Sequence, residues 1–187
     1  GNGYDVIGLE KPLFGSVGRS DVTCTDDIEV KNVNLVNFSG ESFVNQVLEC
    51  KTFTIDGVTI ESFVKDESNY CATYGIVKTV GEIDTSTDRP KTFVMSNCHI
   101  RDEFATIETG LIDYLEYFNN VEINSCSVLS NTNNAAFISN DVYSKKNIDL
   151  VKQNPQYYDV TEEMNNVYES NVLIYNCSNY GSSKYLA

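Results

Sequence analysis

Six short segments spread along the chain follow one template. In each segment the first, third and sixth residues are apolar and the fifth is Gly, Asn or Ser. Apolar residues at all eighteen template positions, in a chain that is 41% hydrophobic, correspond to a chance on the order of 10⁻⁷ before allowing for free choice of alignment. The segments therefore form a repeat. They are residues 4–9, 28–33, 53–58, 93–98, 121–126 and 172–177.

The template predicts a β-strand, a bend and a second β-strand. Apolar residues two apart point to the same side of a β-strand, and a small fifth residue tolerates a tight backbone bend. A second strand then begins with the sixth residue and continues with a further inward residue at Leu35, Ile60, Ile100 and Val128. A recurring unit of strand, bend and strand is typical of a parallel β-helix, whose coils stack about 4.8 Å apart. We expect an all-β fold, a right-handed, single-stranded parallel β-helix of about seven coils.

Stacked coils bring equivalent residues into rows along the solenoid axis. The template predicts an interior row of Val33, Val58, Cys98, Cys126 and Cys177, and a turn row that includes Asn32, Asn97 and Asn176. A second recurring element, a small residue or Pro followed by two bulky apolar residues, predicts a further face of the coil. It occurs at residues 12–14, 42–44, 75–77, 110–112 and 136–138.

The repeat extends over one domain, residues 1–187, with insertions at about 78–91 and 143–170. The second insertion is either a degenerate coil or a protrusion, and Thr161–Met164 favours the protrusion because it resembles the capped start of a short helix. Residues 110–119 could also be helical, but their place in the repeat predicts a strand. Because the chain begins with Gly and lacks a basic and apolar leader, we expect a fragment of a larger protein.

Charge and cysteine spacing exclude several functions. The chain has 13 Lys and Arg against 27 Asp and Glu, a formal net charge of −14, which disfavours binding to nucleic acid or anionic membranes. It has no run of 18 apolar residues, so no membrane insertion is expected. The six cysteines show no CxxC spacing and His99 is the only histidine, so we expect no metal and no cofactor. Buried free thiols acting as small apolar residues are the better interpretation of Cys98, Cys126 and Cys177.

Candidate catalytic residues are few. The adjacent pair Asp26 and Asp27 would diverge on a strand, whereas glycoside hydrolysis needs two carboxylates facing one sugar. The charged segment Arg101–Glu103 is best interpreted as an exposed loop. Cys98 and His99 are neighbours in the chain and would point to opposite faces, so they predict no thiol nucleophile. We expect no enzymatic activity.

The N-terminal residues resemble a known family. Residues Gly1–Leu9, followed by Lys11–Gly15, are similar to the GNGY…PLF element of GLUG-type repeats and of the β-helical domain upstream of the catalytic part in streptococcal IgA-protease-type metallopeptidases. The later elements 75–77 and 110–112 resemble the G-L-[IV]-G step of those repeats. Asn45, Lys78, Asp113 and Ser139 replace the second Gly of that step. The chain contains no H-E-x-x-H motif, so no metalloprotease activity is implied.

The resemblance implies a β-helix on a secreted or cell-wall-attached bacterial protein. We therefore expect a non-catalytic binding or spacer module that is extracellular, adjoins other domains of the same chain and contacts a glycan or a host protein. A phage tailspike or appendage segment and a fragment of a polysaccharide-active β-helix enzyme are the alternatives.

Tyrosines provide the candidate ligand-binding residues. Seven of the 12 lie in the last 45 residues, and exposed Tyr offers an apolar face with a polar edge to sugars and proteins. Tyr157 and Tyr158, with Tyr143 and Tyr168, are the candidates. The alternative is that these rings pack the insertion onto the coil.

Overall fold

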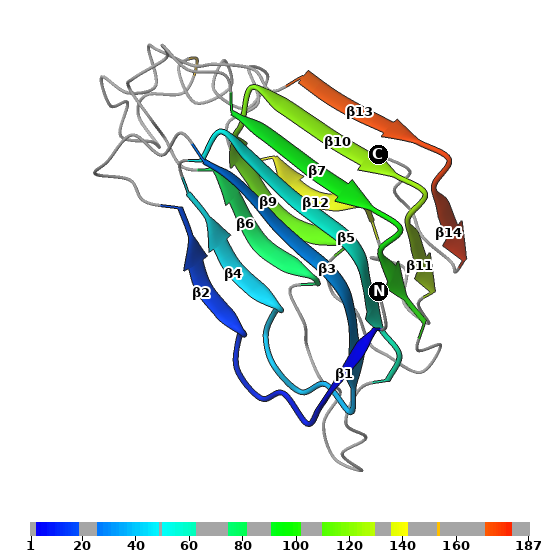
Figure 1. Ribbon diagram of the computed structural model, residues 1–187. Helices are drawn as coiled ribbons and strands as arrows, with labels where there is room; N and C mark the ends of the chain where they lie inside the picture. Colours follow the sequence, from blue (N-terminus) through cyan, green and yellow to red (C-terminus); the bar gives the residue numbers. More distant parts are fainter. Residues whose placement is uncertain are drawn as a thin grey trace.

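A computed structural model describes residues 3–18, 26–48, 50–62, 75–81, 91–101, 110–129, 136–141, 153 and 171–180. Its architecture is all-β and consists of two parallel sheets that face each other (Figure 1). Sheet A contains β1 (Tyr4–Ile7), β3 (Asp27–Val36), β5 (Thr52–Ile60), β7 (Thr92–Ser96), β8 (His99–Ile100), β10 (Asn120–Asn124), β11 (Ser127–Leu129), β13 (Asn171–Tyr175) and β14 (Ser178–Tyr180). Sheet B contains β2 (Phe14–Val17), β4 (Val44–Val47), β6 (Val77–Gly81), β9 (Ile112–Tyr117) and β12 (Ile138–Asp141).

The chain passes repeatedly from sheet A to sheet B and back, and all pairings between these strands are parallel. The prediction of an all-β fold with parallel sheets is confirmed, as is the strand at Ile112–Tyr117. Within the described residues sheet A has six levels: β1, β3, β5, β7 with β8, β10 with β11, and β13 with β14. The handedness of the winding and a seventh coil stay predictions.

Five of the six template segments lie in register. Their first residues align across sheet A in the order Ile28, Phe53, Phe93, Val121 and Val172. The remaining segment differs from expectation, because Tyr4 pairs with Val33 instead of Ile28. Residues 33–38 satisfy the same template, with Asn37 as the small fifth residue, so the apolar pattern alone could not choose between the two alignments.

In the five segments that lie in register, the small fifth residue forms the bend between the two halves of a level of sheet A, whereas Gly8 follows β1 and lies beside Asn37, beyond the end of β3. All six have positive φ, and the bend expected there is confirmed: Gly8 (67°), Asn32 (56°), Gly57 (69°), Asn97 (51°), Ser125 (53°) and Asn176 (54°). This left-handed conformation favours Gly and, among other residues, Asn. We call this position the left-handed bend.

A second corner, which we call the tight corner, precedes β4, β6, β9 and β12 of sheet B. It is formed by Ser42, Gly75, Gly110 and Ala136, and its levels approach very closely. A Cβ added to Gly75 would lie 1.9 Å from the carbonyl oxygen of Gly110, and one added to Gly110 would lie 1.7 Å from that of Ala136. The backbone bonds that hold this corner include Leu111 N to Ala136 O, 3.2 Å. Space, rather than φ alone, restricts the residue type here.

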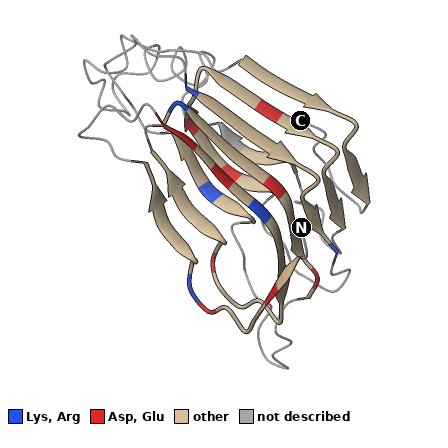
Figure 2. Ribbon diagram, in the orientation of Figure 1, with Lys and Arg blue, Asp and Glu red and all other residues tan. Residues whose placement is uncertain are grey.

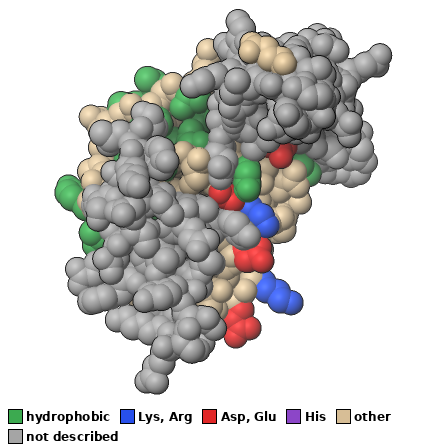
Figure 3. All heavy atoms as spheres, turned by 180° about the vertical axis from the view of Figure 1, so that it is seen from behind, with side chains coloured by type: hydrophobic (Ala, Val, Ile, Leu, Met, Phe, Trp, Pro, Cys, Tyr) green, Lys and Arg blue, Asp and Glu red, His purple; other side chains and the backbone are tan. Residues whose placement is uncertain are grey.

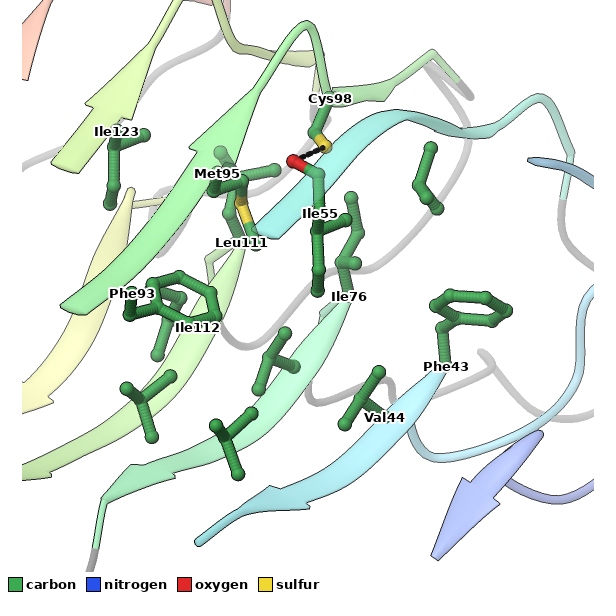
Figure 4. Close-up of a cluster of buried hydrophobic side chains, with 14 of the residues drawn as sticks. Phe43, Val44, Ile55, Ile76, Phe93, Met95, Cys98, Leu111, Ile112 and Ile123 are labelled. Atoms are coloured by element: carbon green, nitrogen blue, oxygen red, sulfur yellow. Dashed lines mark hydrogen bonds between the residues drawn. The ribbon is translucent and has the colours of Figure 1, made fainter. Parts of the chain in front are cut away.

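The core lies between the two sheets (Figure 4). Ile55, Phe93 and Met95 enter it from sheet A, and Ile76 and Leu111 enter it beside sheet B; all five are 0% exposed. Burying one such side chain stabilises the fold by about 1.5–3 kcal/mol before conformational entropy is counted. The stacked apolar columns therefore supply the main driving force for this fold.

The two predicted insertions are only partly within the described residues. Strand β6 runs to Gly81, so the ladder of sheet B continues through residues 78–81, at the start of the first predicted insertion. The bounds of that insertion stay a prediction. Residues 82–90 lie outside the described part of the chain, as do residues 143–170 except Gln153. Whether the second insertion is a coil or a protrusion stays a prediction.

Candidate binding surface

The outward side chains of β3, β5, β7, β10 and β13 form one continuous surface, which we call the outer face. Because side chains alternate along a strand, every second residue of these parallel strands belongs to it. Most of its side chains are polar, and its charged members lie on β3, β5 and β10 (Figure 2). The three rows of the outer face are Asp27–Thr52–Thr92–Asn120–Asn171, Glu29–Thr54–Val94–Glu122–Leu173 and Lys31–Asp56–Ser96–Asn124–Tyr175.

Asp56 lies between Lys31 and Ser96 in one row and is held from the neighbouring level. The Ser96 hydroxyl and the Asn97 side-chain amide both donate to Asp56 Oδ1, each at 2.8 Å. The donation from Asn97, followed by that from Ser96, lowers the pKa of Asp56 below its ordinary value. Asp56 is therefore a fixed, charged acceptor and is poorly suited to donate a proton near neutral pH.

A second cluster lies beside the last level of sheet A. The Tyr175 hydroxyl donates to Glu122 Oε1 at 2.5 Å, and the Asn124 amide donates to the same oxygen at 3.1 Å. The hydrogen bond to Glu122 is the main cause that raises the pKa of Tyr175. Tyr175 is 40% exposed. An accessible aromatic ring beside a carboxylate and an amide suits the binding of a polar ligand with one apolar face.

His99 lies on the second half of sheet A, beyond the left-handed bend. Its Nδ1 is 2.8 Å from the Ser127 hydroxyl. Burial, and then the charge of Arg101, lower the pKa of His99, whereas Glu61 opposes the shift. Glu61 accepts a hydrogen bond from Arg101 at 2.9 Å. The site therefore contains the neutral imidazole of His99 beside the Ser127 hydroxyl, and the nearby Glu61 carboxylate is paired with Arg101. In a catalytic triad the carboxylate would instead accept a hydrogen bond from the imidazole.

The three cysteines of the interior row bond to the backbone next to the left-handed bend. The Cys98 N–H donates to the Cys126 sulfur, and the Cys126 N–H donates to the Cys177 sulfur, each at 3.4 Å. Each thiol also faces the carbonyl oxygen two residues earlier and one on the adjacent level. The carbonyl groups are those of Ser96 (3.2 Å) and Ile55 (3.7 Å) for Cys98, Asn124 (3.1 Å) and Met95 (3.6 Å) for Cys126, and Tyr175 (3.2 Å) and Ile123 (3.5 Å) for Cys177.

These contacts indicate a structural role for the sulfur atoms. Cys98 and Cys126 are buried, Cys177 is half-buried, and Figure 4 shows the Cys98 sulfur directed at the Ile55 carbonyl group. The hydrogen bond with Cys98, followed by burial, raises the pKa of Cys126, and burial raises that of Cys177. A raised pKa disfavours the thiolate that a nucleophile needs.

The residues proposed from the sequence fall into two groups. The interior row from Val33 to Cys177 is continuous in the register of sheet A, and Asn32, Asn97 and Asn176 lie at the left-handed bend. Tyr143, Tyr157, Tyr158 and Tyr168 lie outside the described residues, as do Asp102 and Glu103.

Asp27 of the proposed acidic pair belongs to the outer face. Hydrogen bonds from Thr52 and then from Lys51 lower its pKa, and the Lys51 ammonium group is 3.2 Å from its carboxylate. The described residues contain no group of three or more His, Cys, Asp or Glu side chains that could hold a metal ion. In the same part of the chain, no helix is long and apolar enough to cross a membrane.

Sequence reasoning did not single out the cluster of Glu122, Asn124 and Tyr175. Its signal was present in the template, because these residues occupy the outward second and fourth positions of two aligned segments. The template is defined by its inward first, third and sixth positions, so it does not distinguish the outward ones. Comparisons with protein-family models, curated proteins and solved structures gave no match for this chain.

Proposed function

We propose that this chain is a non-catalytic binding or spacer module of an extracellular bacterial surface protein, built as a right-handed parallel β-helix and contacting a glycan or a host protein. The observation that carries the proposal is the outer face: a continuous, mostly polar surface of in-register rows that ends at the exposed Tyr175. Regular spacing of polar groups suits an extended partner better than a small substrate.

The alternation of the chain between two parallel sheets supports the β-helix part of the proposal. Every described level adds one strand, or one bent pair of strands, to sheet A, and after each of the first five levels the following strand joins sheet B. Such a solenoid grows only along its axis, which makes it a rigid spacer. The resemblance of the N-terminal segment to GLUG-type repeats is the basis for the bacterial, extracellular part.

The state of the reactive side chains supports a non-catalytic role. Asp56 and Glu122 are held by hydrogen bonds from neighbouring levels, Glu61 is paired with Arg101, and the interior thiols bond to backbone groups. On the face that Figure 3 shows, which is turned away from the viewer in Figure 1, the described acidic and basic side chains lie close to one another. None of these arrangements presents a nucleophile together with its base.

A glycan array tests the binding role. We expect the full chain to retain glycans, and Tyr175→Ala to reduce that binding because it removes the exposed ring beside Glu122. Tyr175→Phe is the matched control, since it keeps the ring and removes only the hydroxyl. The double variant Tyr157→Ala with Tyr158→Ala tests the insertion as an alternative site. A chain that retains no glycan and no host surface protein would leave only the spacer role.

Two further measurements separate the alternatives. Release of oligosaccharides from any polysaccharide that the array identifies would overturn the non-catalytic assignment and favour the enzyme fragment. A stable trimer in sedimentation analysis would favour the phage appendage, because such segments usually assemble as trimers.

A further inference from the structure

Exposed apolar side chains gather at the two ends of the described stack. Among the described residues, the exposed large hydrophobic side chains are Tyr4, Ile7, Leu13, Tyr114, Val172, Leu173, Tyr175 and Tyr180. All of them except Tyr114 belong to β1, β13 or β14 or lie next to β2, which are the outermost described strands of the two sheets. Apolar surface of this kind marks a contact surface.

The edge at β13 has the properties of an unprotected strand. Among the described strands β13 pairs only with β10, so no described strand covers its other edge. Val172 continues the column of the buried Phe53, Phe93 and Val121, yet it is 44% exposed, and the outward Leu173 is 57% exposed. Proteins normally guard such edges with charged residues, proline or bulges.

Residues 171–180 contain no charged side chain, in a chain whose net charge is −14 (Figure 2). The opposite edge of sheet A is guarded. There β1 covers only residues 33–36 of β3, and the part that no other described strand covers carries Asp27, Glu29 and Lys31. The uncharged edge is thus one place where two copies of this acidic chain could approach without bringing like charges together.

Stacking of two copies head to tail is sterically blocked. The bent pair β13 and β14 corresponds in register to residues 27–31 and 33–36 of β3. If β13 of one copy paired with the uncovered part of β3 in another, β14 would have to occupy the place of β1. The charged edge therefore cannot accept the uncharged edge without displacing a strand.

We propose that two copies of this chain associate tail to tail, through antiparallel pairing of β13 with the partner's β13 about a twofold axis at Leu173. In this register Leu173 faces the partner's Leu173, and Val172 faces the partner's Ile174. Asn171 faces the partner's Tyr175, which extends the outer face across the interface. The strand is self-complementary, as an isologous interface requires. Direct cross-strand neighbours of this kind stabilise antiparallel pairs.

Sedimentation analysis of the full chain over a range of concentrations tests the proposal. We expect a monomer–dimer equilibrium. Leu173→Lys should raise the dimer dissociation constant at least tenfold, because it places two like charges opposite each other. Ile7→Lys is the matched control, since Ile7 is a 71% exposed apolar residue on the opposite edge, and it should leave the equilibrium unchanged. Circular dichroism melting curves would verify that both variants fold.

Cross-linking tests the register independently. Leu173→Cys should form a disulfide-linked dimer under mild oxidation, whereas Ile7→Cys should not. A wild-type chain that stays monomeric at the highest concentration, or an equally strong effect of Ile7→Lys, would overturn the proposal. A trimer would overturn it together with the proposed function, whereas loss of glycan binding alone would leave the dimer unaffected.

Discussion

The left-handed bend and the tight corner both select small residues, but for different physical reasons. At the left-handed bend the restriction is conformational: Asn97 and Ser125 carry side chains there, at φ of 51° and 53°. At the tight corner the restriction at Gly110 is spatial, since a Cβ would overlap the backbone of the next level. A small residue in a repeat therefore has two meanings, and only the structure shows which substitutions each corner tolerates.

The largest effect is expected at the tight corner. Gly110→Ala would place a Cβ 1.7 Å from the Ala136 carbonyl oxygen, a backbone atom that cannot rotate away. We expect a loss of about 3 kcal/mol or more in the free energy of unfolding, or failure to fold. Urea denaturation measures this loss. Gly15→Ala is the control, because no atom lies within 4 Å of its added Cβ, and it should change stability by less than about 0.5 kcal/mol.

A smaller effect is expected at the left-handed bend. Gly57→Ala would introduce a Cβ at φ +69°, which costs about 1–2 kcal/mol. Its closest contact, Asn32 Oδ1 at 2.8 Å, is the end of a side chain that can move. The same urea experiment should rank Gly57→Ala well below Gly110→Ala. Equal losses would contradict the distinction between the two corners.

The sulfur row beside the left-handed bend allows a matched comparison. Cys126→Val removes the sulfur that accepts the Cys98 N–H, whereas Cys98→Val makes the same change in volume but leaves that N–H with its acceptor. We expect Cys126→Val to be less stable than Cys98→Val by about 1–2 kcal/mol, the cost of a buried donor without a partner. Val33 and Val58 show that valine fits this row. Indistinguishable unfolding midpoints would mean that the sulfur bonds contribute nothing.

The smallest effect concerns Asn97 and the charge of Asp56. Asn97→Gly relieves the cost of positive φ but removes a hydrogen bond that lowers the pKa of Asp56. A lowered pKa in the folded state adds stability above the unfolded pKa, and this stability is lost as the pH falls through the folded value. The contribution lost with Asn97 is expected to be below about 1 kcal/mol, because Asp56 is partly exposed. Below the ordinary Asp pKa of 3.8, the free energy of unfolding of Asn97→Gly should therefore rise relative to that of the wild type.

Unfolding curves at pH 7 and at pH 2.5 for the two proteins would measure that shift. If the free energies of unfolding of the two proteins differ by the same amount at both pH values, Asn97 does not influence the ionisation of Asp56 in the folded protein.

Much of both sheets was predictable because their pattern is local and repeated. The apolar columns, the bend at the fifth residue and the strand at Ile112–Tyr117 all follow from spacing within a single level. The error concerned residues 4–9, whose partner depends on a contact with a distant segment. Two segments of β3 satisfied the same template, and only the packing of β1 selected the second.

The candidate surface was less predictable than the fold. Outward positions of a repeat vary freely, because they are not constrained by the core. Their chemistry arises only when levels stack, as when Glu122 meets Tyr175 across 53 positions of sequence. Cys98 and His99, which are conspicuous neighbours in the sequence, have different partners: the Cys98 sulfur faces the Ile55 carbonyl group, and the His99 ring lies beside the Ser127 hydroxyl.

By itself, the sequence of this protein determined which residues point inward and where each level bends, because both depend on the period of a strand and on local backbone energetics. Only the tertiary structure decided which levels meet, why Gly110 must lack a side chain and how the thiols bond. These features depend on contacts with backbone atoms of another level. The spacing of residues within one level does not predict which atoms of another level will lie beside them.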